Sequence, residues 1–358
     1  MASLPLRRTL LPLAAVAFLA VPAEAQTSQT SYTKSSGYVQ IDITPATSGT
    51  APALSALSAT LTNPAEFAGN ITVAADFGVP GADQQTINVA GVTWTGGQWT
   101  GVPHVFFIKA ASGAEESFLI LSNTATSVVV STTFDLLSDP PTGGRFPAAT
   151  TGTIRKANTI GKLFGETPAD VPFKKFFISA GADNIFLFSG TLWITYFHNG
   201  TSWVRIPAGA GDPKDDVVFT SEGMFILRRD TGLLTLTFFG DVASAAKILT
   251  VPGIGLTLAS SGFPVGQTID NYGFDSLPNW KKFFISAGAD KVYVWYNSVN
   301  GWATYFHNGT TGWQVIPPAG LSITVADPIP PDSAMFIDRI VVDTAAESGA
   351  EVDLPYIP

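Results

Sequence analysis

The chain has 358 residues, and only 13% of them are charged, with 19 Lys and Arg against 28 Asp and Glu. The net charge of −9 disfavours nucleic acid and anionic lipid as partners, because both are bound by clustered Lys and Arg. The absence of cysteine excludes disulfides, thiol catalysis and cysteine-held metals. Abundant Phe, Trp, Gly and Pro with little charge predict an all-β protein.

Residues 1–25 have the three parts of a secretory signal peptide. Arg7 and Arg8 precede an apolar stretch at 9–22, and Ala23-Glu24-Ala25 forms a small-residue cleavage pattern. Cleavage would leave 19 − 2 = 17 basic and 28 − 1 = 27 acidic side chains, a net charge of −10. We therefore expect an exported protein of the periplasm, cell surface or medium, with no transmembrane segment after cleavage.

A leader and linker are predicted over residues 26–60. Within them, residues 37–44 alternate apolar and polar side chains, which indicates a half-buried strand. Residues 45–60 are small and interrupted by proline, and we expect a loop there. Ser31 and Lys34 have S-x-x-K spacing, but they lie in a polar leader that cannot hold a nucleophile rigidly.

A small N-terminal β barrel or sandwich is predicted over residues 61–150. Five short strand-like runs recur there, separated by Gly, Pro, Asn and Asp. They are residues 70–77, 85–95, 104–111, 116–123 and 127–134. Residues 138–147, SDPPTGGRFP, indicate the end of this domain.

The rest of the chain contains an internal repeat. KKFFISAGAD occurs at 174–183 and again at 281–290, and each copy is followed by related hairpin sequences. This predicts two duplicated β sandwich-like units, at about 151–245 and 246–342, which pack on each other. We expect FFIS to be a short strand, and SAGAD to be a turn in which the glycine has positive φ.

Each repeat carries a predicted hairpin, and an acidic tail follows the second. Asn199-Gly200 and Asn308-Gly309 stand between strand-like runs, which predicts type I′ turns. Residues 343–358 form the acidic tail. Its last six residues, DLPYIP, either add an edge strand or remain disordered.

Catalytic motifs are absent from the sequence, which favours a non-enzymatic protein without a cofactor. His198 and His307 occupy equivalent positions beside the hairpin turns and could hold a metal if the copies faced each other. We interpret them instead as polar residues at hairpin ends. Asp183 and Asp290 are interpreted as turn residues that bond their own backbone two residues further on.

The repeated aromatic residues are the main candidates for binding. Tyr and Trp offer a flat apolar face with a polar group, which suits sugar rings and protein interfaces. Alternation puts Tyr305 and Phe306 on opposite faces, so one of them should lie outside or at a contact between domains. The candidate ligand-binding residues are Trp193, Tyr196, His198, Trp203, Trp302, Tyr305, His307 and Trp313.

The chain resembles an uncharacterised family of exported twin-repeat β-rich proteins of Verrucomicrobia-type bacteria. The resemblance is carried by TNPAEFAGN at 62–70, by ATYFHNGTTGWQVI in the second copy, and by VVFTSEGMFILRR at 217–229. It covers most of residues 38–342, and the second copy departs from it with Asp338 between Ile337 and Arg339. The resemblance implies export and a two-copy β architecture, and it implies no functional residue.

These observations predict a secreted, non-enzymatic structural or adhesive protein of the cell surface or matrix. The alternative is a carbohydrate-binding protein whose duplicated aromatic sites gain avidity. The expected partners are a polysaccharide or another cell-surface protein. A third interpretation, an outer-membrane barrel, is opposed by the 25 prolines.

Overall fold

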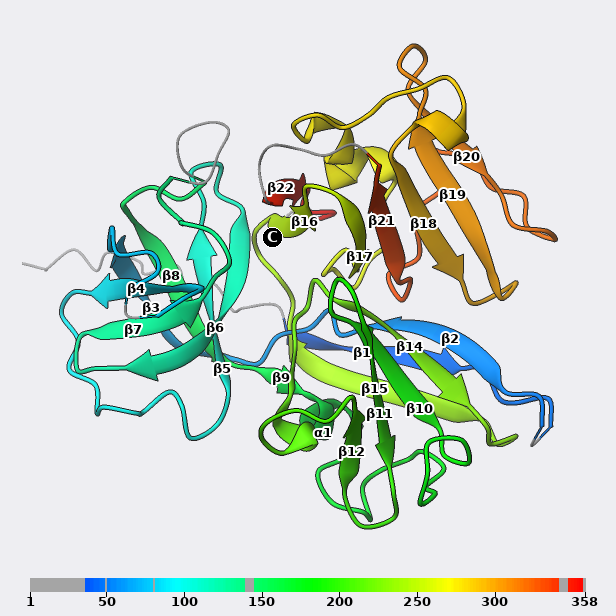
Figure 1. Ribbon diagram of the computed structural model, residues 1–358, viewed down its shortest axis with the longest axis horizontal. Helices are drawn as coiled ribbons and strands as arrows, with labels where there is room; N and C mark the ends of the chain where they lie inside the picture. Colours follow the sequence, from blue (N-terminus) through cyan, green and yellow to red (C-terminus); the bar gives the residue numbers. More distant parts are fainter. Residues whose placement is uncertain (1–35, 49, 80, 139–144, 341–346, 357–358) are drawn as a thin grey trace, which may run out of the picture. The chain divides into compact units, whose positions relative to one another are not determined.

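The computed structural model describes residues 36–48, 50–79, 81–138, 145–340 and 347–356. These residues form five β-sheets with one five-residue α-helix, which confirms the predicted all-β class (Figure 1). The predicted signal peptide and nearly all of the polar leader lie outside the described residues.

Six strands between residues 65 and 156 close into a barrel. The strands follow the order β6-β5-β8-β3-β4-β7, and pairing of β7 with β6 completes the circle. Its interior is filled by buried apolar residues such as Ile87, Phe106, Val128 and Ile154. The strands are β3 (Ala65–Val73), β4 (Gln84–Val89), β5 (His104–Lys109), β6 (Glu115–Asn123), β7 (Ser127–Ser131) and β8 (Ala149–Lys156).

The barrel was predicted, but its last strand was not. β8 pairs with both β3 and β5, so the barrel extends past residue 150. The Pro- and Gly-rich residues 138–147 precede this strand and do not end the domain. A loop that connects two strands of one barrel has the same composition as a linker, because both must bend.

A five-stranded sheet contains the first copy of the repeat. Its order is β12-β11-β10-β14-β2, and a two-stranded sheet of β1 and β15 shares its core. The five strands are β2 (Ala53–Ser58), β10 (Asn184–Phe188), β11 (Trp193–His198), β12 (Trp203–Ile206) and β14 (Gly223–Arg228). The accompanying elements are β1 (Ser36–Ile43), β15 (Leu234–Asp241), β9 (Asn158–Thr159), β13 (Val217–Val218), α1 (Ile160–Phe164) and η1 (Pro213–Asp215).

The predicted strand at 37–44 is confirmed as β1, whereas the predicted loop at 45–60 is wrong for Ala53–Ser58. These six residues pair with β14 along its whole length. The small side chains of ALSALS have low intrinsic preference for strands, so the sequence gives no signal there. Burial and pairing with a neighbouring strand override that preference.

A second five-stranded sheet contains the second copy. Its order is β17-β21-β18-β19-β20, and β22 pairs with β16 beside it. The strands are β16 (Lys247–Pro252), β17 (Gly255–Ala259), β18 (Lys291–Tyr296), β19 (Gly301–His307), β20 (Trp313–Ile316), β21 (Met335–Arg339) and β22 (Glu347–Val352). The 3-10 helices are η2 (Ile269–Tyr272), η3 (Phe274–Ser276) and η4 (Ser286–Gly288). In the tail, Tyr356 Oη donates to Ala243 O at 2.9 Å, so the tail docks beyond β22 without forming another strand as far as residue 356.

The two five-stranded sheets have the same strand order. β2, β14, β10, β11 and β12 correspond in sequence to β17, β21, β18, β19 and β20, and β1 with β15 corresponds to β16 with β22. In the chain, the barrel strands therefore stand between β2 and β10 of the first sheet (Figure 1). An origin by duplication remains a prediction. If it is correct, the first copy includes β1 and β2, which precede the predicted limit at residue 151.

The hairpins are present, but their turns are not type I′. Gly200 and Gly309 have φ of 106° and 86°, whereas the asparagines before them do not have positive φ. The Asn199 side chain accepts hydrogen bonds from the N–H groups of Thr201 and Ser202 at 2.8 and 2.9 Å. This asparagine-capped loop is longer than a two-residue turn, and it needs positive φ only at the glycine.

The repeated decapeptide also differs from its prediction. FFIS forms no strand in either copy, and neither Gly181 nor Gly288 has positive φ. Asp183 does not bond its own turn, because its buried carboxylate accepts from Lys174 N at 2.8 Å and from Arg229 N at 2.5 Å. The predicted turn chemistry is wrong here, because Asp183 joins the two ends of the decapeptide and ties them to the residue after β14.

Candidate functional site

The candidate aromatic residues lie on two faces of the sheets. In β11 and β19, successive side chains point to opposite faces, so Trp193 and Tyr196 separate, as do Trp302 and Tyr305. Four of the candidate Tyr and Trp residues are at most 4% exposed and belong to the cores of their copies. These are Tyr196, Trp203, Tyr305 and Trp313.

The buried tyrosines have partners inside the fold. Tyr196 Oη donates to Asp216 Oδ2 at 2.8 Å, and the hydroxyls of Tyr305 and Tyr296 lie 2.8 Å apart. Burial, followed by the neighbouring Asp216 carboxylate, raises the pKa of Tyr196, and burial with the Tyr296 hydroxyl raises that of Tyr305. Phe306, on the opposite face from Tyr305, is also buried at 8% exposure. These side chains offer no surface to a ligand.

The two histidines serve their own hairpins. The Nδ1 atoms of His198 and His307 accept from Gly200 N and Gly309 N, each at 3.1 Å. Burial lowers the pKa of both imidazoles, and Lys175 or Lys282 lowers it further. Each imidazole is therefore a neutral acceptor that fixes its hairpin turn.

Trp193 and Trp302, in contrast, meet in one groove. Trp193 is 44% exposed, and Trp302 is half-buried. The groove has a volume of about 390 Å³, and it is formed by the outer faces of the two five-stranded sheets. Its lining residues are Leu54, Phe186, Trp193, Phe225, Trp302 and Phe336. We call this set the aromatic groove.

Four rings of the groove form a closed cycle. Phe225 lies 6.2 Å from Trp193 and 5.7 Å from Trp302 between ring centroids. Phe336 lies 5.7 Å from Trp193 and 5.6 Å from Trp302. Most of these pairs are edge-to-face, a geometry that contributes about 0.5–1.5 kcal/mol per pair beyond area burial. The cycle holds the two tryptophans in fixed positions.

The contacts between the sheets are reciprocal. Phe225 of the first sheet meets Trp302 and Trp295 of the second, at 5.7 and 5.8 Å. Phe336, the residue that corresponds to Phe225, meets Trp193 and Phe188 of the first sheet, at 5.7 and 5.5 Å. Such exchange of equivalent contacts is the property of an isologous interface. The two repeated tryptophans therefore belong to one shared groove and not to two separate sites.

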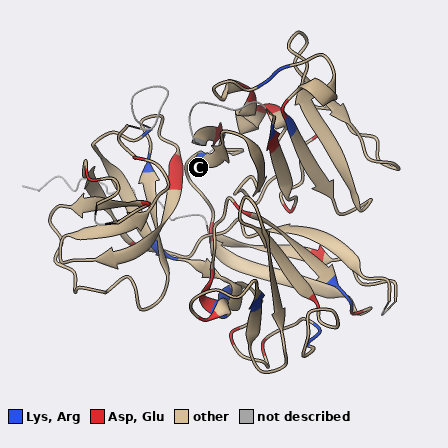
Figure 2. Ribbon diagram, viewed as in Figure 1, with Lys and Arg blue, Asp and Glu red and all other residues tan. Residues whose placement is uncertain are grey.

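The groove is uncharged as well as apolar. All six of its lining side chains are hydrocarbon or aromatic. β10, β11 and β19 contain no Lys, Arg, Asp or Glu, and they are tan along their length in Figure 2. The surface can offer stacking and apolar contact, but its lining offers no group for acid–base chemistry.

Sequence reasoning found only two of the six groove residues. Phe225 and Phe336 could have been found, because each follows the matched Met224 or Met335 and alternation turns it to the opposite face. Phe186 occupies an alternating position in β10, next to Trp193. Leu54 gave no signal, because its stretch has the composition of a loop.

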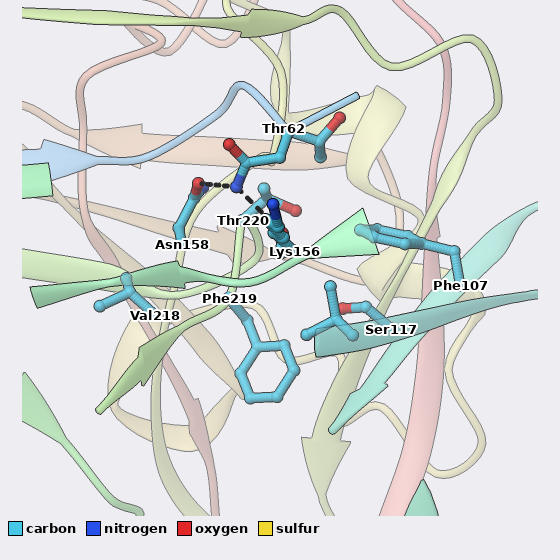
Figure 3. Close-up of a pocket in the computed structure, with 10 residues that line it drawn as sticks. Thr62, Phe107, Ser117, Lys156, Asn158, Val218, Phe219 and Thr220 are labelled. Carbon is cyan, nitrogen blue, oxygen red and sulfur yellow. Dashed lines mark hydrogen bonds between the residues drawn. The ribbon is translucent and has the colours of Figure 1, made fainter. Parts of the chain in front are cut away.

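Two other cavities suit a ligand less well. The one in Figure 3 lies among Phe107, Asn158 and Thr220, and its volume of about 10 Å³ has room for one water molecule. A second cavity of about 220 Å³ is lined by Glu116 and Glu222 among other residues. The Glu116 carboxylate already binds Arg145 Nη1 at 2.6 Å and accepts from the Thr250 hydroxyl.

The half-buried Glu222 and the buried Lys247, beside these cavities, predict a stability minimum near neutral pH. Burial raises the pKa of the Glu222 carboxyl from 4.5 to about 7, and it lowers the pKa of the Lys247 ammonium from 10.5 to about 8. Stability should therefore fall as pH rises from 4.5 through 7, and recover as pH rises from 8 towards 10.5. We expect each change to be about 1–3 kcal/mol in urea unfolding at pH 5, 7.5 and 9.5.

Single substitutions separate the two contributions to this pH dependence. Glu222→Gln should remove the loss of stability between pH 5 and 7.5, while Lys247→Met should remove the gain between pH 7.5 and 9.5. A wild-type protein that is more stable at pH 7.5 than at pH 5 would contradict the assignment of Glu222.

Comparison of the chain with protein-family models, curated proteins and solved structures finds no match. Across the described parts of the chain, no helix has the length and apolar character needed to cross a membrane. The same residues contain no group of three or more His, Asp or Glu that could hold a metal ion. The family resemblance drawn from the sequence thus remains a prediction.

Proposed function

We propose that this chain is an exported structural or adhesive protein that acts by non-enzymatic binding at the aromatic groove. The observation that carries the proposal is the convergence of Trp193 and Trp302 on one uncharged groove lined by six apolar side chains. Aromatic residues are enriched at the centres of protein–protein contacts, and Trp is one of the residue types that most often contribute a large share of the binding free energy there.

Carbohydrate binding is the second candidate. The exposed ring of Trp193 could stack on the apolar face of a sugar. A sugar also needs hydrogen-bond partners for its hydroxyls, and the groove lining supplies two indole N–H donors and no acceptor. The apolar lining therefore favours a protein partner over a polysaccharide.

Removing the exposed tryptophan should weaken binding without unfolding the protein. We expect Trp193→Ala to lower the affinity for the partner by about tenfold or more, because a central Trp commonly contributes about 2 kcal/mol. Trp302→Ala should have a similar effect, since both rings line the same groove. The partner should bind once per chain, as measured by analytical ultracentrifugation or calorimetry.

Leu233→Ala is the matched control, because Leu233 is 90% exposed and lies outside the groove. Equal affinities of the Trp193→Ala variant and this control for the partner would contradict the proposal. Saturable quenching of tryptophan fluorescence by a polysaccharide, lost in Trp193→Ala, would establish the carbohydrate alternative. Two binding events per chain would contradict a single shared groove.

A further inference from the structure

The repeated decapeptide forms the same loop in both copies, and the tip of each loop is apolar and exposed. Phe177 and Phe284 are 71% and 70% exposed, and Ile178 and Ile285 are 48% and 49% exposed. We call each Phe–Ile pair a knob. Each pair places two adjoining exposed apolar side chains on the surface, and such apolar patches can mark a place of contact.

The base of each loop is tightly held. Asp183 Oδ2 accepts from Lys174 N at 2.8 Å, and Asp183 N donates to Lys174 O at 3.0 Å. Asp290 and Lys281 exchange the same two bonds, both at 2.9 Å. These bonds close the loop, so each knob is displayed on a fixed base at little cost in entropy.

Packing explains the glycine and the first phenylalanine of the loop. A Cβ at Gly181 would lie 2.1 Å from the Phe176 ring, and a Cβ at Gly288 would lie 2.3 Å from the Phe283 ring. Only glycine therefore lets the first phenylalanine fold back onto the loop. That ring then lies 4.5 Å from Phe177, with 4.4 Å in the second copy.

Packing does not explain the knobs. Contacts within the fold account for the identity of three positions in the two loops: the buried Asp, the Gly and the first Phe. The knob side chains are exposed, so such contacts do not account for their identity. The copies already differ immediately after the decapeptide, with NIFLF in the first and KVYVW in the second. Two exposed apolar residues kept identical in otherwise different copies indicate that both knobs contact the same kind of surface.

We propose that each knob docks into the aromatic groove of a second copy of this chain, an inference that rests on the proposed function. The groove is continuous with the contact between the sheets, so a phenylalanine ring entering it extends the existing edge-to-face cluster. Its volume of about 390 Å³ has room for a phenylalanine side chain. The reciprocal pairs Trp193–Phe336 and Trp302–Phe225 offer the knob equivalent rings from either side.

Each knob lies beside charge opposite in sign to that of the chain as a whole. Each knob follows two lysines, Lys174 and Lys175 or Lys281 and Lys282, while the whole chain has a net charge of −9. The lysines of one copy are therefore attracted to the acidic surface of another, which offsets part of the repulsion between two chains of like net charge. Because knob and groove are different surfaces, two copies that exchange knobs close into a dimer, whereas a one-way contact builds a ring or an open assembly.

A mixing experiment tests this pairing on the full chain. One variant loses both knobs (Phe177→Ser with Phe284→Ser), and the other loses the groove tryptophans (Trp193→Ala with Trp302→Ala). The wild type should self-associate, and each variant alone should associate at least about tenfold more weakly in sedimentation velocity. An equimolar mixture should form small complexes of defined size, because one variant supplies grooves and the other supplies knobs.

The control is Leu233→Ser, which should associate like the wild type, with circular dichroism confirming that all variants are folded. If the knob variant assembles like the wild type and only the groove variant fails, the knobs are not the partner and the proposed function survives. If both variants assemble like the wild type, neither knob docking nor binding at the aromatic groove is correct. A wild type that stays monomeric, or sedimentation with phosphatidylglycerol vesicles that depends on Phe177 and Phe284, overturns docking to a second copy.

Discussion

Asp183→Ala is expected to lower the free energy of unfolding by about 3–5 kcal/mol, because it leaves a buried guanidinium without its counter-charge. Asp183 is 3% exposed, and its partner Arg228 is 2% exposed. Arg228 Nη1 donates directly to Asp183 Oδ2. A charge that far from water cannot be rehydrated when its partner is removed.

The same carboxylate also holds two backbone groups. Its oxygens accept from Lys174 N and Arg229 N, which tie the decapeptide loop to the end of β14. Asp183→Asn should therefore also be costly, because an amide cannot present an acceptor to both N–H groups. Asp290→Ala should behave similarly, since Asp290 is fully buried and accepts from Lys281 N and Ile340 N at 2.9 and 2.8 Å.

Urea unfolding followed by circular dichroism measures these effects, and the chain provides a matched control. Asp212 and Lys214 form an ion pair at 3.2 Å whose two side chains are both exposed. Lys214→Ala removes this pair but keeps the hydrogen bond from Lys214 N to Asp212 Oδ1, so it should leave stability unchanged, because exposed pairs are screened by water. A loss of less than about 1 kcal/mol for Asp183→Ala would show that the buried pair contributes no more than a surface pair.

Local sequence patterns predicted much of the fold. Alternation and turn residues located the barrel strands β3 to β7, β1, and the hairpins of β11 with β12 and β19 with β20. Their own residues carry the alternation or the turn signal, even where the partner strand is distant, as β15 is for β1. β2 and β8 were missed, because small or polar strands are stabilised by partners distant in sequence, β14 for β2 and β3 with β5 for β8.

The candidate site could be predicted only in part. Alternation correctly places Trp193 and Tyr196 on opposite faces, but it does not say which face is covered. The inner face is covered by β1 and β15, whose residues Ile41, Ile43, Leu236 and Phe238 share the core with Tyr196. Which aromatic residues stay accessible thus follows from packing between distant strands, and that packing leaves Trp193 and Trp302 at the rim of one groove.

The repeated tryptophans should therefore divide into two classes in mutagenesis. We expect Trp203→Ala and Trp313→Ala to lower the free energy of unfolding by about 3–5 kcal/mol, because each side chain is 4% exposed and leaves a large cavity. Trp193→Ala should cost less, about 1–3 kcal/mol, since 44% of its surface is already exposed. The free energy of unfolding should be measured in urea by far-ultraviolet circular dichroism, because each substitution removes a tryptophan and so alters the fluorescence signal.

Phenylalanine substitutions then separate packing from hydrogen bonding in the two core positions. Trp203 Nε1 donates to Gly165 O at 2.9 Å, whereas Trp313 Nε1 is buried without a hydrogen-bond partner in the described part of the chain. Trp203→Phe should therefore be more destabilising than Trp313→Phe by about 1–3 kcal/mol, because it leaves the Gly165 carbonyl without its partner. Equal losses for the two phenylalanine variants would show that the hydrogen bond from Trp203 Nε1 to Gly165 O contributes nothing beyond packing. A Trp193→Ala variant that fails to fold would show that Trp193 belongs to the core and not to the groove.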